Sequence, residues 1–488
     1  MTRMFSSHPR YPCNPRLEVS GRADISFTIF ARRSDIAFRE SCLTESMKKL
    51  LLVSLAAALA QAASASSAPD VTLRVTPERE YYYRLGPREM IMQVEVEARK
   101  SDDARRAPMN LCVVLDRSGS MEGAKIEKAR QAAAMAVDKL ADDDIFSLVT
   151  YDNETDLLIP PERVGGRDHR EDLKARIHRI QPGGSTALHA GVVLGAKQVR
   201  RFLEKERVNR VILLSDGLAN VGPSSTSDLA RLGRELRGEG IAVSTIGLGD
   251  DYNEDLMTAL AEASNANYYY VKDSEKLPGI FAQELGAARS LCARDIVIRI
   301  QAPDGVRLKE IIGRPDIECH DRVAEIKMPE LFGSEKRRFL VRCLAEGKTA
   351  EALEPASVEL NYVTLAGPQA PAQRQAAKIT FTDDKSKSDS SVQVEVAREN
   401  SIVQNRLAKE QAVKLADEGK SKDAVALLRE QAARNAAAPA PMQVPGMAEE
   451  NRKLEDAASE IDAKGQLAKS RRKSMQFENY SDKYQKVR

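Results

Sequence analysis

The hydrophobic and polar positions follow two different periods along the chain, and the change of period separates its main regions. Between residues 109 and 288, short apolar runs alternate with segments whose apolar residues recur at helical spacing. Such a strand–helix succession is typical of a parallel sheet covered by helices on both faces. We therefore predict an α/β domain. Its six expected strands are Leu111–Leu115, Ile145–Tyr151, Leu157–Ile159, Val211–Leu214, Ile241–Gly247 and Tyr268–Val271.

After this domain the pattern changes to a period of two. Ile296, Ile298 and Ile300 would lie on one face of a strand, and further alternating segments follow, separated by Pro, Gly and charged turns. This pattern predicts antiparallel strands with one buried face. The later strands are expected at Val323–Met328, Arg338–Leu344, Val358–Leu365, Ala377–Thr382 and Val392–Val396.

Two alternating segments, Val71–Val75 and Met90–Ala98, precede the α/β domain. Two strands alone do not form a stable sheet, so these need partners from elsewhere in the chain. We predict that residues 66–108 and 289–398 together form one antiparallel β-sandwich, and that the α/β domain is inserted between its two parts.

Helical spacing returns near the C-terminus. Residues 399–435 predict a helical hairpin, made of Ser401–Ala416 and Lys422–Ala433 joined at Gly419. Residues 436–488 contain an Ala/Pro-rich segment and then many charges with few apolar anchors. We interpret them as a linker and a charged tail with at most one helix.

The beginning of the chain differs from the rest. Residues 47–65 have two lysines, an apolar stretch at Leu50–Ala60 and the small residues Ala63-Ser64-Ala65, which together predict a secretory signal peptide. Its apolar stretch is shorter than the roughly 20 residues that a membrane span needs. Residues 1–46 are then an upstream extension, and the mature protein is expected to be periplasmic or secreted.

The charge balance argues against nucleic acid as a partner. The first 65 residues contain nine of the 74 Lys and Arg and five of the 72 Asp and Glu, so the remainder has a net charge of −2. Phosphate binding requires clustered positive charge, which this chain lacks. No later stretch is apolar enough to be expected to cross a bilayer.

Four cysteines follow the signal peptide, and they allow three disulfide pairings that the sequence does not distinguish. They are Cys112, Cys292, Cys319 and Cys343. Cys112 lies inside an expected strand, where an unpaired thiol acts as a small apolar side chain. We favour a bond between Cys319 and Cys343.

The loop after the first strand of the α/β domain contains the first candidate site. Asp116, Ser118 and Ser120 place one carboxylate and two hydroxyls at alternating positions, and Gly119 permits a tight turn between them. Oxygen ligands suit a hard cation such as Mg²⁺. The same residues also fit a loop that caps the helix expected at Ile126–Leu140.

Two later segments add to this loop. Thr186 ends a Gly-rich turn before an expected helix, and Asp216 follows the strand Val211–Leu214. Ligands of open α/β sheets bind at the carboxyl ends of strands, near the point where the strand order reverses. Asp116 and Asp216 both lie at such ends, so we expect them to share one crevice.

With these residues, Asn110–Leu285 resembles a von Willebrand factor type A (VWA) domain with its metal-ion-dependent adhesion site. All five positions of the family's metal motif are filled, by Asp116, Ser118, Ser120, Thr186 and Asp216. The resemblance implies a doubly wound, Rossmann-like fold and a bound Mg²⁺, with Mn²⁺ or Ca²⁺ as alternatives. It also implies a protein partner whose Asp or Glu completes the coordination, and hence a non-enzymatic adhesion or scaffold module.

Other functions remain open at this stage. A metal with a free position could activate water, with His189 or Asp250 as the base, although H-E-x-x-H, P-loop and G-x-S-x-G motifs are absent. The chain could instead be a VWA accessory subunit of a metal-handling, channel or AAA+ complex. The expected signal peptide argues against an ATP-driven partner, and we favour metal-dependent protein binding.

Overall fold

The computed structural model describes residues 69–485, apart from residues 87, 100–106, 220, 347–350, 366, 368 and 439–445. The predicted extension (residues 1–46) and signal peptide (residues 47–65) lie outside the described residues. Among the helices of the described part, none has both the length and the apolar character required to span a membrane.

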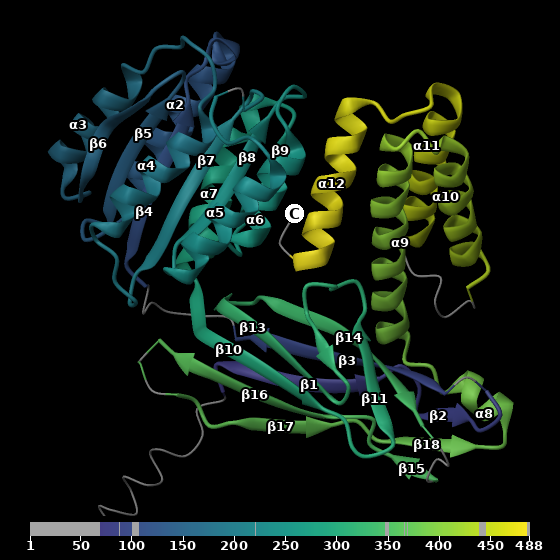
Figure 1. The fold of residues 1–488 in the computed structure, drawn as a ribbon. Coiled ribbons are helices and arrows are strands. Elements are labelled where there is room, and N and C mark those ends of the chain that lie inside the picture. Colours follow the sequence, from purple (N-terminus) through teal and green to yellow (C-terminus); the bar gives the residue numbers. More distant parts are fainter. Residues whose placement is uncertain are drawn as a thin grey trace, which may run out of the picture. The chain divides into compact units, whose positions relative to one another are not determined.

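Six strands form the sheet of the α/β domain, in the order β6-β5-β4-β7-β8-β9 (Figure 1). Neighbouring strands run parallel except β5 and β6, which are antiparallel. The predicted α/β sheet is therefore confirmed. The strands are β4 (Met109–Asp116), β5 (Ile145–Tyr151), β6 (Thr155–Arg163), β7 (Val208–Ser215), β8 (Ala242–Leu248) and β9 (Tyr268–Val271).

Helices cover both faces of this sheet because alternate residues of its central strand face opposite sides. Leu111, Val113 and Leu115 of β4 pack with α2, α3 and α7, whereas Cys112 and Val114 pack with α4, α5 and α6. The helices are α2 (Ala124–Lys139), α3 (Arg167–His178), α4 (Leu188–Arg200), α5 (Thr226–Gly238), α6 (Glu254–Ala263) and α7 (Leu277–Arg289), with short 3₁₀ turns η1 (Gly119–Met121) and η2 (Ser274–Lys276).

Strands that precede the α/β domain in the sequence and strands that follow it form one sheet, in the order β1-β3-β14-β11. β3 pairs antiparallel with β14 from Glu89↔Leu344 to Glu97↔Lys336. Because β3 precedes the α/β domain in the sequence and β14 follows it, the α/β domain is inserted between two parts of one β domain, as the sequence predicted. The strands of this sheet are β1 (Val71–Pro77), β3 (Glu89–Ala98), β11 (Val306–Ile311) and β14 (Lys336–Ala345).

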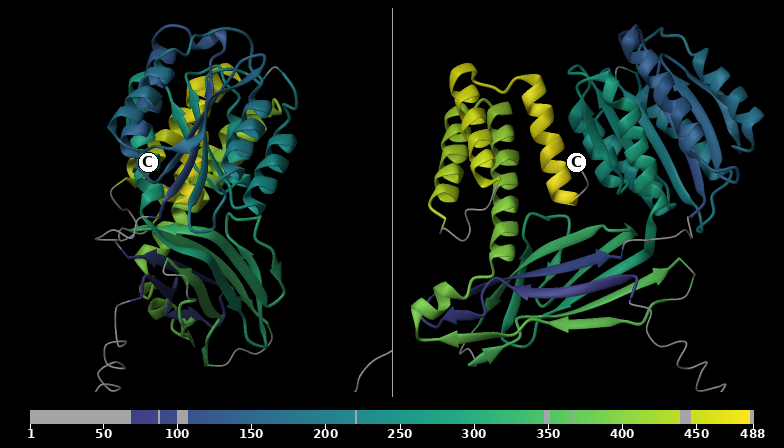
Figure 2. Two further views of the ribbon diagram at one scale, coloured as in Figure 1. Left: turned by 90° about the vertical axis from the view of Figure 1, so that its left-hand side faces the viewer. Right: turned by 180° about the vertical axis from the view of Figure 1, so that it is seen from behind.

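A second sheet, ordered β12-β13-β10-β16-β17, contributes to the same core, and Figure 2 shows both sheets from two sides. Ile296, Ile298 and Ile300 of β10 are fully buried there, as their spacing predicted. The remaining strands are β10 (Leu291–Gln301), β12 (Cys319–His320), β13 (Val323–Phe332), β16 (Ser357–Thr364) and β17 (Gln373–Ala376), with a three-stranded sheet of β2 (Tyr81–Tyr83), β15 (Ala352–Leu353) and β18 (Ile379–Thr382).

The predicted strand Val392–Val396 is wrong, because helix α9 (Val394–Asp417) begins inside it. Val-Gln-Val-Glu-Val alternates over only five residues, and Val396 packs as a helical residue against Ile312 and Leu340. The two helices of the predicted hairpin correspond to α9 and α10 (Ser421–Ala436), and α8 (Lys385–Ser390) precedes them.

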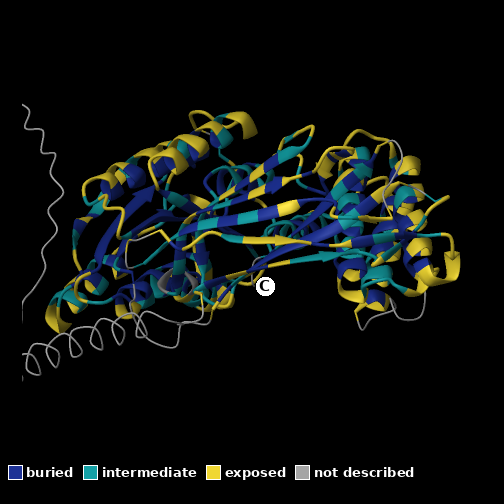
Figure 3. Ribbon diagram, turned by 90° about the horizontal axis from the view of Figure 1, so that it is seen from below, coloured by how far each residue is buried: buried dark blue, intermediate teal, exposed yellow. Residues whose placement is uncertain are grey.

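The interpretation of residues 436–488 as a charged tail with at most one helix is also wrong. The described part contains α11 (Met447–Lys464) and α12 (Lys469–Tyr484). The few apolar residues of α11 recur at helical spacing, and Leu454, Ala458 and Ile461 are fully buried against α9 and α10. Figure 3 shows that helices of the structure have both buried and exposed residues.

Candidate metal centre

The five predicted site residues lie at one edge of the α/β sheet: Asp116 ends β4, and the other four lie in or beside the loops at this edge. β4 and β7 are parallel neighbours in which Leu115 pairs with Leu214, so Asp116 and Asp216 follow at adjacent strand ends. Ser118 and Ser120 lie in the turn around η1, and Thr186 precedes α4. Asp116 and Asp216 therefore lie close together, as the strand ends led us to expect.

Three hydroxyls of the site gather around Gly217. A Cβ atom placed on this glycine would lie 3.1 Å from Thr186 Oγ1, 3.5 Å from Ser120 Oγ and 3.9 Å from Ser118 Oγ. The Ser118 and Ser120 oxygens are 3.1 Å apart, and Ser120 Oγ donates to Asp216 Oδ1 at 2.7 Å. The absence of a side chain at Gly217 leaves room at the point where these oxygens meet.

Asp116 is fully buried and held in place by its neighbours. Its Oδ1 accepts from the backbone N–H of Ser118 at 2.8 Å, and its Oδ2 accepts from Ser215 Oγ at 2.7 Å. Burial and, to a smaller extent, the charge of Asp216 raise the pKa of the Asp116 carboxyl to about 6, although these hydrogen bonds act to lower it. Hydrogen bonds thus hold the Asp116 carboxyl, and among the described residues no cation forms an ion pair with it.

Lys125 is a site residue that the sequence did not reveal. Its Nζ lies 2.5 Å from Asp216 Oδ2, and its side chain is one-third exposed. The available signal was its position in the first turn of α2, nine residues after Asp116. The lysine neutralises Asp216 but makes no recorded contact with Asp116.

The donor set fits a hard cation. Two carboxylates and three hydroxyls offer only oxygen, the preferred ligand of Mg²⁺, and two negative charges would balance one divalent ion. Sites built from three or more His, Cys, Asp or Glu do not occur among the described residues. The five-residue cluster is thus distinct from an all-carboxylate or a zinc site.

The candidate bases for metal-assisted hydrolysis lie outside this cluster. Asp250 accepts a hydrogen bond from Tyr270 Oη at 2.6 Å. Burial lowers the pKa of His189, and the charges nearest to it belong to α5, at Asp228, Arg231 and Glu235. Neither side chain has a recorded bond to the five site residues.

The cysteines do not contribute to the site. Cys112, Cys292, Cys319 and Cys343 are all free thiols in the structure, so the favoured Cys319–Cys343 bond is not formed. Cys112 is fully buried in β4, where burial raises the pKa of its thiol to about 12. It therefore behaves as the small apolar residue that its position predicted.

The family model of the von Willebrand factor type A domain matches residues 110–283. The chain contains a VWA domain. This match covers the α/β sheet and all five candidate residues, so the predicted domain type and its Rossmann-like fold are confirmed.

Two known bacterial proteins are similar to part of this chain. The chain is 32% identical over 192 residues to "Uncharacterized protein sll0103" of Synechocystis sp., and 26% identical over 213 residues to "Uncharacterized protein YfbK" of Escherichia coli. These segments cover 39% and 43% of this chain. They span 44% and 36% of the two relatives, so less than half of each relative is matched.

A solved structure extends the similarity beyond the VWA domain. The "von Willebrand factor type A from Catenulispora acidiphila" aligns with a TM-score of 0.65 and 18% sequence identity. The alignment covers 87% of this chain and 99% of that chain. At this identity the likeness shows a shared fold, and it includes regions outside the VWA domain.

Proposed function

We propose that the VWA domain binds a divalent cation, preferably Mg²⁺, with Mn²⁺ or Ca²⁺ as alternatives. The ligands would be Asp116, Ser118, Ser120, Thr186 and Asp216. One observation carries this proposal: three hydroxyls converge beside two buried carboxylates, around a glycine that leaves the space between them open. VWA domains are generally protein-interaction modules, and of the five proposed ligands Ser120 is the one that is exposed at this edge of the sheet.

The bound cation would offer an open coordination position to a carboxylate from another protein. Because three of the five ligands are uncharged hydroxyls, the cation would keep a strong local field at its open coordination position, which attracts a carboxylate oxygen. The chain's residues have distinct tasks: Ser118 and Ser215 orient Asp116, and Ser120 positions Asp216. We propose a non-enzymatic adhesion or scaffold role, in the periplasm or outside the cell.

Metal-dependent capture tests this role. The chain is immobilised and exposed to proteins of its own compartment in Mg²⁺ or in EDTA. We expect Mg²⁺-dependent capture that disappears with Asp116→Ala, and also when the offered proteins have had their carboxyl groups converted to amides. Capture that survives amidation, or that Asp116→Ala leaves unchanged, would contradict a metal-bridged carboxylate.

The buried Asp116 predicts a pH effect on the metal-free protein. Its pKa rises from 3.8 in the unfolded chain to about 6 in the folded one, so its ionisation opposes folding. This cost is absent below about pH 4 and complete above about pH 6, where it reaches about 3 kcal/mol. The free energy of unfolding of the wild type, relative to Asp116→Asn, should therefore fall as the pH rises through this window.

Urea denaturation in EDTA between pH 4 and pH 7 measures this difference. Asp116→Asn keeps the size of the side chain and removes its titration, so other ionisable groups affect both proteins alike. If the free energies of unfolding of the two proteins changed in parallel with pH, the folded protein would not raise the pKa of Asp116, and the prediction would be wrong.

A further inference from the structure

Both carboxylate oxygens of Asp216 have hydrogen-bond donors. This side chain is fully buried, and its Oδ1 accepts from Ser120 Oγ at 2.7 Å, whereas its Oδ2 accepts from Lys125 Nζ at 2.5 Å. Ser120 can share a cation with Asp216 because its hydroxyl oxygen has lone pairs of its own, but the Lys125 ammonium has only donors. One oxygen of a proposed ligand is therefore held by a group that cannot itself bind a cation.

Lys125 occupies a position in α2 that favours the opposite charge. It is the second residue of this helix, which begins at Ala124. The N-terminal end of a helix carries a partial positive charge, so it stabilises an acidic side chain such as Glu127 in the same turn and repels a lysine. The charge of Lys125 therefore stabilises Asp216 and not the helix.

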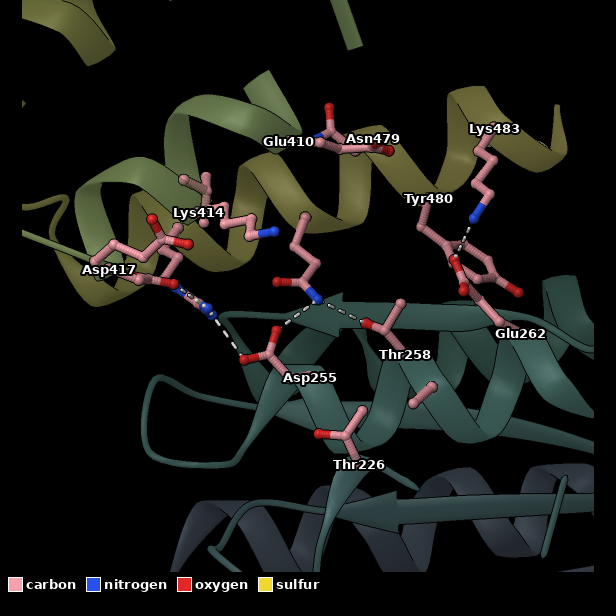
Figure 4. Close-up of a pocket in the computed structure, with 15 residues that line it drawn as sticks. Thr226, Asp255, Thr258, Glu262, Glu410, Lys414, Asp417, Asn479, Tyr480 and Lys483 are labelled. Atoms are coloured by element: carbon pink, nitrogen blue, oxygen red, sulfur yellow. Dashed lines mark hydrogen bonds and ion pairs between the residues drawn. The ribbon is translucent and has the colours of Figure 1, made fainter. Parts of the chain in front are cut away.

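Other cations of the chain pair with carboxylates that are not among the five proposed ligands. In the pocket between α6, α9 and α12, for example, Lys483 pairs with Glu262 at 3.3 Å (Figure 4). Arg117, in the loop that follows β4, pairs with Asp152 at 3.0 Å. Within the described part of the chain, Lys125 is the one cation with a recorded ion pair to a proposed ligand.

We infer that Lys125 competes with the divalent cation for Asp216, an inference that rests on the proposed function. Without a cation, the ammonium balances a buried carboxylate that would otherwise be unpaired. A bound cation takes over this balance, and its two positive charges repel the ammonium. Because the Lys125 side chain is one-third exposed, it can turn toward water. Lys125 thus lowers the affinity of the site for cations and holds Asp216 in place until one binds.

Calorimetric titration of the full chain with Mg²⁺ tests this competition. Lys125→Met removes the charge, and we expect it to lower the Mg²⁺ dissociation constant by about tenfold or more, which is the repulsion between a divalent ion and an ammonium about 5 Å apart even at the dielectric constant of water. Lys128→Met is the control, because Lys128 lies one turn further along α2 and pairs with Glu275, outside the site. Its dissociation constant should stay close to that of the wild type.

The direction of the change separates competition from a structural role. If Lys125 only positioned Asp216 for the cation, its removal would weaken Mg²⁺ binding. Lys125→Gln provides a second variant should Lys125→Met fail to fold, because its amide can still donate to Asp216 without a charge. An equal or higher dissociation constant in these variants, beside a wild type that binds Mg²⁺, would overturn the inference and leave the proposed function standing. Failure of the wild type and of both variants to bind any cation would overturn the inference and the proposed function together.

Discussion

Replacing Glu284 by Ala is expected to lower the free energy of unfolding by about 3–5 kcal/mol. Glu284 on α7 is fully buried and pairs with Arg210 of β7 at 2.5 Å, and Arg210 is itself only 3% exposed. Its carboxylate also accepts hydrogen bonds from Asn267 at 2.6 Å and from Tyr269 at 2.8 Å. Although burial alone would raise it, Arg210 and these bonds hold the pKa of Glu284 below its usual value.

Removing this carboxylate leaves several buried donors without their acceptor, and leaves the buried guanidinium of Arg210 with only its longer ion pair to Glu330, at 3.5 Å. Glu275→Ala is the matched control, since Glu275 is 65% exposed and its pair with Lys128 should contribute at most about 1 kcal/mol. Urea denaturation of both variants measures the difference. If Glu284→Ala lowered the free energy of unfolding as little as the control does, the prediction would be wrong. The ion pair between Arg210 and Glu330, at 3.5 Å, would then replace the one with Glu284.

Replacing Thr186 and Asp216 together by Ala is expected to abolish cation binding and to leave the fold intact. The change removes one hydroxyl and one carboxylate, two of the five proposed ligands. Lys125 loses its partner, but its side chain is one-third exposed and can turn to water, so the structural cost is small. Asp250→Ala is the control, because this substitution removes a carboxylate that is not one of the five proposed ligands. The Asp250→Ala variant should bind cations as the wild type does.

The sequence predicts the VWA sheet well because its central strands are buried on both faces. β4 and β7 each have eight consecutive buried residues, and the apolar runs Leu111–Leu115 and Val211–Leu214 inside them predict the two strands. The site follows from the same topology, since parallel strand ends must lie at one edge. Asp116 and Asp216 can therefore be placed together without knowledge of any side-chain contact.

Other features depend on contacts that no local pattern encodes. The alternation at Val392–Val396 fits a strand as well as the first turn of a helix, and burial of Val396 in the folded chain decides for the helix. Lys473 belongs to a run of charges that resembles a solvated surface until its partners on the VWA domain are known. Lys125 likewise gains its role only when Asp216, 91 residues away, folds beside it.

Calorimetric titration of residues 66–488 with Mg²⁺, Mn²⁺ and Ca²⁺ tests the central claim most directly. We predict saturable binding of one cation per chain, unchanged in Asp250→Ala and lost in the Thr186→Ala and Asp216→Ala double variant. The absence of saturable binding for all three cations would contradict the claim. Equal binding in the double variant would contradict it as well, by placing the cation elsewhere in the chain.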